Sequence, residues 1–157
     1  MKTTKLSLDK TIKMIRRILF STLLINILFS CNTSDNTRIN NPYLVDINVN
    51  LNINLGLPEY NSLNFPGNSY TTYNYGLNGV VVYNINNSQY LAFELTDPNH
   101  AVSSCSRLSV QGLIATCDCE DGNEYNILTG EITQGDGQYA LKSYRVRKNG
   151  NSLEISN

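Results

Sequence analysis

The chain has 157 residues, including one histidine and four cysteines, and a formal net charge of −1 at pH 7. Six of its 12 basic residues but only one of its 13 acidic residues lie before Cys31, so the rest of the chain is strongly acidic. A domain of this sign repels nucleic acid and anionic lipid headgroups, so neither is an expected partner. A single histidine also disfavours enzymes that order a base beside a Ser or Cys nucleophile, and we expect no enzyme.

The first 30 residues have the pattern of a secretory signal. Basic residues precede an uncharged apolar run over residues 18–29, which is too short to span a bilayer. The sequence L-F-S-C that ends at Cys31 resembles the lipobox of bacterial lipoproteins, in which the cysteine carries the lipid and becomes the mature N-terminus. The resemblance implies a domain anchored to a membrane in the bacterial cell envelope, facing the periplasm or the cell surface. The alternative is a secreted protein cleaved nearby.

A tether and one domain are expected after the signal. Residues 31–42 are polar and lack an apolar period, which predicts a tether, and residues 43–157 form the predicted domain. About 127 residues beyond the signal suffice for one hydrophobic core but not for two. Over residues 46–55, apolar residues occupy every second position and asparagines fill the others. This alternation predicts a strand with a solvated face, at an edge or in an open sheet.

The middle of the chain predicts a loop and a hairpin. Residues 58–75 are rich in Pro, Asn, Ser and Tyr, so we expect a long loop with at most one helical turn at 59–63. Two strand-like segments flank the turn-forming sequence N-N-S at 86–88: residues 79–84, nearly continuously apolar over V-V-V-Y, and residues 90–96. They predict a β-hairpin whose first strand is buried on both faces.

The remaining segments also favour strands and turns. In chain order we expect a loop at 97–106, a strand pair or one bent strand at 107–116, a short strand at 125–128, a loop at 134–137, and a hairpin of 139–148 with 152–155 that turns at Asn149-Gly150 in type I′ geometry. No segment has a convincing helical period. The predicted fold class is therefore all-β, as a small antiparallel sandwich or barrel.

The cysteines predict one disulfide and one free thiol. If Cys31 carries lipid, three cysteines remain in an exported and oxidising setting. Cys117 and Cys119 are two residues apart, so on an extended backbone they point the same way and cannot easily bond each other. Cys105 is therefore expected to pair with one of the two.

Several motifs resemble the Rieske iron–sulfur family. They are the C-D-C-E sequence at 117–120, the strand and turn Y-N-I-L-T-G-E at 125–131, the segment A-F-E-L-T-D-P-N-H at 92–100, and L-K-S-Y-R-V at 141–146. In that family two loops each supply one Cys and one His to a [2Fe-2S] cluster. One branch joins the loops through a further Cys on each. The resemblance implies a Rieske-like β domain in which a Cys105–Cys119 disulfide joins the two loops.

Carried over residue by residue, the resemblance leaves the ligand set incomplete. His100 matches the histidine of the first loop and Cys117 the cysteine of the second. Pro98 stands where the first loop has its ligand cysteine, and proline offers no side-chain donor. Glu120, or Asp121 if the register shifts by one residue, stands where the second histidine is needed. The resemblance therefore implies a scaffold that keeps its disulfide and has lost its cluster, so no cofactor is expected.

Three functions remain open. The first is a membrane-anchored binding or structural module, with a protein partner possible. The alternative is an electron-transfer protein with a [2Fe-2S] cluster or a single metal ion in an altered site made of His100, Cys117, Glu120 and Asp121. Asp97 and Asp118 lie on the same loops, and carboxylates with one imidazole suit Ca²⁺, Mn²⁺ or Zn²⁺, although solvated loop carboxylates are a simpler reading. The third is a redox-active thiol at Cys117, which the lack of a C-x-x-C motif disfavours.

Overall fold

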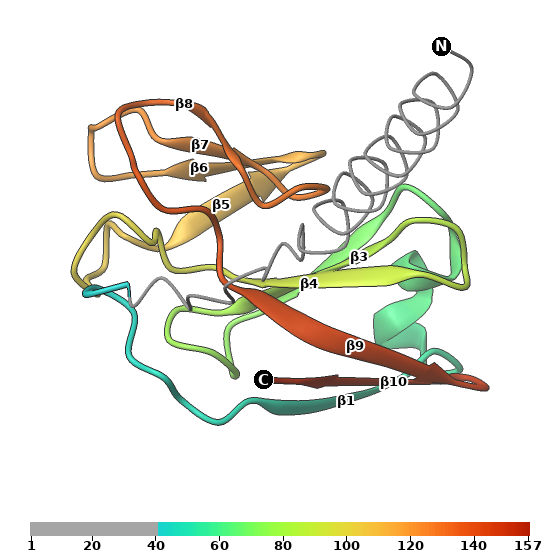
Figure 1. Cartoon of the computed structure of the whole chain (residues 1–157). Coiled ribbons are helices and arrows are strands. Elements are labelled where there is room, and N and C mark those ends of the chain that lie inside the picture. The colour runs from blue at the N-terminus through green and yellow to red at the C-terminus, as the bar shows by residue number, and fades with distance from the viewer. Residues whose placement is uncertain (1–40) are drawn as a thin grey trace, which may run out of the picture. The chain divides into compact units, whose positions relative to one another are not determined.

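Ten antiparallel β-strands in two sheets form the framework of residues 41–157, the part of the chain that the computed structural model describes (Figure 1). The predicted signal at 1–30, the predicted lipidation at Cys31 and most of the predicted tether lie outside the described residues. Within residues 41–157, no helix is long and apolar enough to cross a membrane. The all-β prediction is confirmed.

The larger sheet has six strands and the smaller has four. The six-stranded sheet runs in the order β1 (Asn50–Asn54), β10 (Ser152–Ser156), β9 (Ser143–Asn149), β4 (Tyr90–Glu94), β3 (Val80–Asn84) and β2 (Ser69–Thr72). The four-stranded sheet runs in the order β5 (Leu108–Gln111), β6 (Ile114–Cys117), β7 (Glu124–Asn126) and β8 (Ile132–Gln134).

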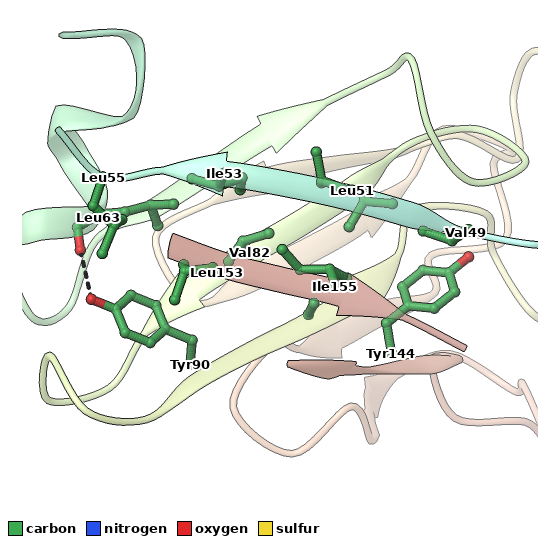
Figure 2. Close-up of a cluster of buried hydrophobic side chains, with 12 residues drawn as sticks. Val49, Leu51, Ile53, Leu55, Leu63, Val82, Tyr90, Tyr144, Leu153 and Ile155 are labelled. Carbon is green, nitrogen blue, oxygen red and sulfur yellow. Dashed lines mark hydrogen bonds between the residues drawn. The ribbon is translucent and has the colours of Figure 1, made fainter. Parts of the chain in front are cut away.

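The alternating strand at the start of the domain lies at a sheet edge, as predicted. In β1 the apolar residues Leu51 and Ile53 are buried, and the asparagines at positions 50, 52 and 54 are exposed. Figure 2 shows Leu51 and Ile53 in one buried cluster with Val82 of β3, although β1 and β3 are not neighbours in the sheet order. The six-stranded sheet therefore curls, because its first strand packs over the face of its fifth.

The hairpin of β3 and β4 separates two hydrophobic clusters. Val80 and Val82 face the cluster that contains β1 and β10, whereas Val81 and Tyr83 face a second cluster. That second cluster holds buried residues of the four-stranded sheet, such as Tyr125, and Figure 1 shows β5 to β8 on the other side of β3 and β4 from β1. Residues buried on both faces explain why the predicted strand at 79–84 reads as a continuous apolar run.

Two short strands and one helix differ from the predictions. The expected loop at 58–75 contains the seven-residue 3₁₀ helix η1 (Pro58–Asn64) and also strand β2. Strand β8 begins in a segment for which no strand is expected. Both strands lie at sheet edges, and β2 is only half-buried over most of its length, so neither has a clear alternation of buried and exposed residues.

The predicted C-terminal hairpin is confirmed, but the predicted type I′ turn at Asn149-Gly150 is wrong. Asn149 pairs with Ser152, so the two turn residues are Gly150 and Asn151. Of these, only Gly150 has a positive φ, at 57°. A type I′ turn requires positive φ at both central residues, which Asn151 does not supply.

Candidate functional site

Two loops at one end of the β3–β4 hairpin and of the four-stranded sheet form the candidate site. The first loop, residues 97–106, joins β4 to β5 and is closed at its base by a 2.7 Å hydrogen bond from the Asp97 N–H to the Ser106 carbonyl. The second, residues 118–123, joins β6 to β7 and is closed by a 2.9 Å bond from the Cys117 N–H to the Asn123 carbonyl. Both loops thus start from paired strands.

A disulfide between Cys105 and Cys119 joins the two loops. Their Cα atoms lie 4.8 Å apart, within the range that a disulfide spans. The pairing that the resemblance implies is confirmed, and Cys117 is the free cysteine among the described residues. The disulfide fixes the two loops against each other and so fixes the side chains that each presents to the site.

Cys117 lies at the end of β6 with its side chain toward the second hydrophobic cluster. Alternation along β6 buries Ala115 and Cys117 on the same side. Burial, together with a hydrogen bond to Asp97, raises the pKa of the Cys117 thiol to about 12. The thiol is therefore protonated at neutral pH, and this side chain is not a ready nucleophile.

Asp97 is a fully buried carboxylate beside that thiol. Its Oδ1 accepts hydrogen bonds from the Tyr125 hydroxyl and from the Asn99 N–H, each at 2.7 Å. Its Oδ2 accepts one from the side-chain amide of Asn123 at 3.2 Å. These three donors are neutral, so the carboxylate is oriented without being neutralised by them.

His100 and Asp121 face each other across the two loops. The distance from His100 Nε2 to Asp121 Oδ2 is 2.6 Å, and the two side chains are 32% and 24% exposed. Burial raises the pKa of Asp121, but hydrogen bonds from His100 and from the Asn123 N–H outweigh it, so the net pKa lies below the usual value. The only histidine of the chain is thus held by a carboxylate of the opposite loop.

Four side chains converge at this point. One ligand atom from each of Asp97, His100, Cys117 and Asp121 lies within 4.8 Å of the others. The structure therefore brings together three of the four residues predicted for an altered metal site, and their role as ligands stays a prediction. It adds Asp97, which the sequence places only among several loop carboxylates.

Glu120, the fourth predicted ligand, does not join this group. It is exposed and has a positive φ of 64°, so the backbone turns there. Asp121 takes the position opposite His100 instead. Cys119 also lies near His100 and Cys117, but its sulfur is bonded to Cys105 and cannot serve as a thiolate.

A pocket of about 480 Å³ opens beside the His100–Asp121 pair. Its walls include Tyr43, Tyr139 and the carboxylate of Asp136. Asn99 holds one wall in place, because its side-chain oxygen accepts hydrogen bonds from the N–H groups of residues 138 and 139 and its amide donates to the Tyr139 carbonyl. The exposed parts of His100 and Asp121 are thus reached through an opening lined by both polar and aromatic side chains.

The donors at this site do not match those of a Rieske cluster. Such a cluster takes two thiolates and two imidazoles. Pro98 has no side-chain donor, and its carbonyl accepts a 2.7 Å hydrogen bond from the amide of Asn41. A carboxylate, Asp121, occupies the place opposite the only imidazole. One thiol and one imidazole remain, beside two carboxylates.

Comparison with known proteins finds partial structural likenesses. No family model and no curated protein matches the chain. The cyanobacterial plasma membrane Rieske protein PetC3 from Synechocystis PCC 6803 is 24% identical, covering 50% of this chain and 77% of its own, with a TM-score of 0.42. The ferredoxin of carbazole 1,9a-dioxygenase from Nocardioides aromaticivorans IC177 is 16% identical, covering 58% and 86%, with a TM-score of 0.40.

A third similar structure is a complex of reduced oxygenase and oxidised ferredoxin in carbazole 1,9a-dioxygenase, at 22% identity. It covers 58% of this chain and 82% of the matched chain, with a TM-score of 0.42. These solved structures are of the Rieske and ferredoxin kind.

Proposed function

We propose that the protein is a Rieske-like lipoprotein, anchored to a membrane of the bacterial cell envelope through Cys31, that carries no [2Fe-2S] cluster. In this proposal it is a binding module and not an enzyme. The observation that carries the proposal is the 2.6 Å contact between His100 Nε2 and Asp121 Oδ2, which replaces a pair of imidazoles by an imidazole and a carboxylate.

The donor count supports the loss of the cluster. A [2Fe-2S] cluster of the Rieske kind needs four ligands at fixed positions. With proline at position 98 and aspartate at position 121, two of those four are missing. The disulfide, in contrast, is retained. A disulfide that still joins the two loops without a cluster between them keeps their geometry fixed. Fixed loops are what a binding site at this end of the domain requires.

The chemistry of the remaining groups supports a role in binding. The raised pKa of Cys117 keeps its thiol protonated, and the histidine is occupied by Asp121. Neither arrangement supplies an activated nucleophile with a free base. The pocket combines tyrosine rings with carboxylate and amide groups, a mixture suited to recognition.

Electron transfer through a [2Fe-2S] cluster is the alternative, and metal content separates the two. The full chain is produced in iron-replete, anaerobic cells and purified in detergent. A Rieske protein with a complete ligand set is produced in the same way, as a positive control for cluster insertion. We expect a colourless protein without stoichiometric iron while the control is brown. A brown protein with about two irons per chain and the electron paramagnetic resonance signal of a reduced cluster overturns the proposal.

The membrane anchor has its own test. Acyl chains on Cys31 contribute about 0.8 kcal/mol per buried CH₂, so the protein with intact Cys31 is expected in the membrane fraction. The Cys31→Ser variant, expressed from the same vector, is expected in the soluble fraction. Retention of that variant in the membrane fraction contradicts anchoring by lipid at this residue.

A further inference from the structure

The two loops place one thiol, one imidazole and two carboxylates around a common point. Their ligand atoms lie within 4.8 Å of one another, and they come from positions 97, 100, 117 and 121. We propose that these four residues bind a single zinc ion. The zinc site rests on the proposed function, because the same side chains cannot hold both a [2Fe-2S] cluster and one zinc ion.

The types of ligand favour zinc over the other common divalent ions. Zinc takes thiolate sulfur, imidazole nitrogen and carboxylate oxygen, usually in a tetrahedron. Calcium and magnesium prefer oxygen ligands alone, so Cys117 and His100 would be poor partners for them. Ligand atoms about 2.0 to 2.3 Å from one zinc ion lie roughly 3.3 to 3.8 Å apart. To reach this geometry, separations of up to 4.8 Å in the group have to shorten and the 2.6 Å contact between His100 and Asp121 has to widen.

The local charge also favours a cation. Asp97 is fully buried, and its three neutral hydrogen-bond donors satisfy its oxygens but bring no positive charge beside it. Within residues 41–157, the ion pairs are His100–Asp121 and Lys142–Asp46, so no lysine or arginine pairs with Asp97 or Asp121 there. A divalent ion between the two carboxylates would neutralise charge that the described protein groups leave in place.

The buried carboxylate already has the hydrogen bonds that metal ligands usually receive. The Tyr125 hydroxyl, the Asn99 N–H and the Asn123 amide all donate to Asp97. Such outer hydrogen bonds fix the orientation of a ligating carboxylate, and their loss typically weakens metal affinity. Asp97 is thus held in one orientation before any ion arrives.

The ion has a route to the site and the proton has a route away. His100 and Asp121 line the 480 Å³ pocket and are partly exposed, so an ion can enter between them. On binding, the His100–Asp121 contact opens and each side chain turns its ligand atom to the zinc. The Cys117 S–H bond breaks, a Zn–S bond forms, and the proton leaves to solvent through the pocket.

Metal titration of the full chain tests the site. The protein is purified in detergent without a histidine tag, stripped with a chelator, and titrated with Zn²⁺ in competition with a chromophoric chelator. Co²⁺ is titrated separately as a spectroscopic probe. We expect one ion per chain, and a cobalt spectrum with the intense visible bands of tetrahedral coordination and a near-ultraviolet thiolate-to-cobalt band.

Three variants connect the binding to these residues. Loss of an outer hydrogen bond typically weakens affinity by about 10- to 100-fold, so loss of a ligand should cost at least about tenfold. Cys117→Ser should lose the thiolate band and at least about tenfold in affinity, and Asp121→Asn should lose similar affinity but keep the band. Glu120→Gln, an exposed neighbour outside the group, is the matched control and should change affinity by less than about twofold.

The outcomes separate this site from the proposed function. Failure of the iron-free protein to bind cobalt or zinc overturns the zinc site alone, as does binding that is unchanged in both Cys117→Ser and Asp121→Asn. If Cys117→Ser does not fold, as judged by circular dichroism, the zinc affinity of Asp121→Asn tests the site by itself, because Asp121 is partly exposed. A cluster with about two irons per chain overturns the proposed function, and the zinc site with it.

Discussion

The hydroxyl of Tyr125 donates a 2.7 Å hydrogen bond to Oδ1 of Asp97, and this bond joins the two sheets beneath the site. Tyr125 lies in β7 of the four-stranded sheet, while Asp97 follows β4 of the six-stranded sheet. Both side chains are fully buried. The buried base of the site is therefore a contact between the two sheets. Substitutions there should change the free energy of unfolding of the whole domain.

Tyr125→Phe should destabilise the domain by about 2 kcal/mol, because it removes a hydrogen bond from a buried carboxylate and leaves that group less satisfied. Urea unfolding followed by circular dichroism measures the change. Tyr73→Phe is the matched control: the Tyr73 ring is 57% exposed and keeps its contact with Arg107, so the change should stay within about 0.5 kcal/mol. Equal effects of the two substitutions would show that the Asp97 bond contributes nothing to stability.

Removing the Cys105–Cys119 disulfide should cost about 3 kcal/mol. The two residues are 14 apart, and closing a loop of about 15 residues stabilises by about this amount in the chain-entropy model. The Cys105→Ser, Cys119→Ser double variant should unfold at lower urea than the oxidised protein. Reductant should lower the midpoint of the wild-type protein toward that of the variant and leave the variant unchanged. A reductant effect on the double variant would mean that another cysteine is involved.

Local patterns predict those strands whose burial alternates or is complete. The alternation around Leu51 predicts β1, and the continuous apolar run around Val81 predicts a strand that is buried on both faces. These patterns follow directly from which faces are covered. Strands β2 and β8 have no such pattern, because each lies at an edge where neighbouring strands, and not its own side chains, decide its conformation.

The sequence names three of the four residues that converge at the site, but it does not decide which acidic residue of the second loop faces His100. The family resemblance places Glu120 at the position of the second histidine, or Asp121 if the register shifts by one residue, since one residue inserted in a loop moves every later side chain. The positive φ of Glu120 decides between them, and that is a property of the folded loop. The convergence of Asp97 with Cys117 likewise depends on two sheets packing together, which no local pattern encodes.

The Cys117 thiol should be unreactive in the folded protein. With its pKa raised to about 12, only about one molecule in 10⁴ carries the thiolate at pH 8. Ellman's reagent is therefore expected to label the chelator-stripped Cys31→Ser protein very slowly under native conditions. Denatured without reductant, the same protein should show one thiol per chain, since the other two cysteines form the disulfide.

Two results would contradict this expectation. Rapid labelling of the folded protein would support the redox-thiol alternative, because a reactive thiol must be both exposed and partly ionised. Three titratable thiols in the denatured, unreduced protein would show that the Cys105–Cys119 disulfide is not formed. The Cys105→Ser, Cys119→Ser double variant in the Cys31→Ser background is the control, because Cys117 alone can react in it.

Alkaline pH should destabilise the domain through tyrosines whose pKa is raised in the folded state. The Tyr144 hydroxyl donates a 2.6 Å hydrogen bond to Oε2 of Glu94, a fully buried carboxylate. Burial and that hydrogen bond raise the pKa of Tyr144 far above its ordinary value of 10.0, and burial is the main cause that raises the pKa of Tyr60 to about 12. A raised folded-state pKa contributes stability that is fully present below pH 10 and is lost as the pH rises above it, because the unfolded chain then releases the proton first.

Urea unfolding of wild-type protein and Tyr144→Phe between pH 8 and pH 11.5 measures this effect. The buried Tyr144 contributes a slope of up to about 1.4 kcal/mol per pH unit above pH 10, so the variant should lose stability less steeply than the wild type. At pH 8 the variant should be the less stable of the two by about 2 kcal/mol, because Glu94 loses a donor. Tyr73→Phe, at an exposed ring, should follow the wild-type curve. Parallel curves for wild type and Tyr144→Phe would mean that Tyr144 ionises equally in the folded and unfolded chains.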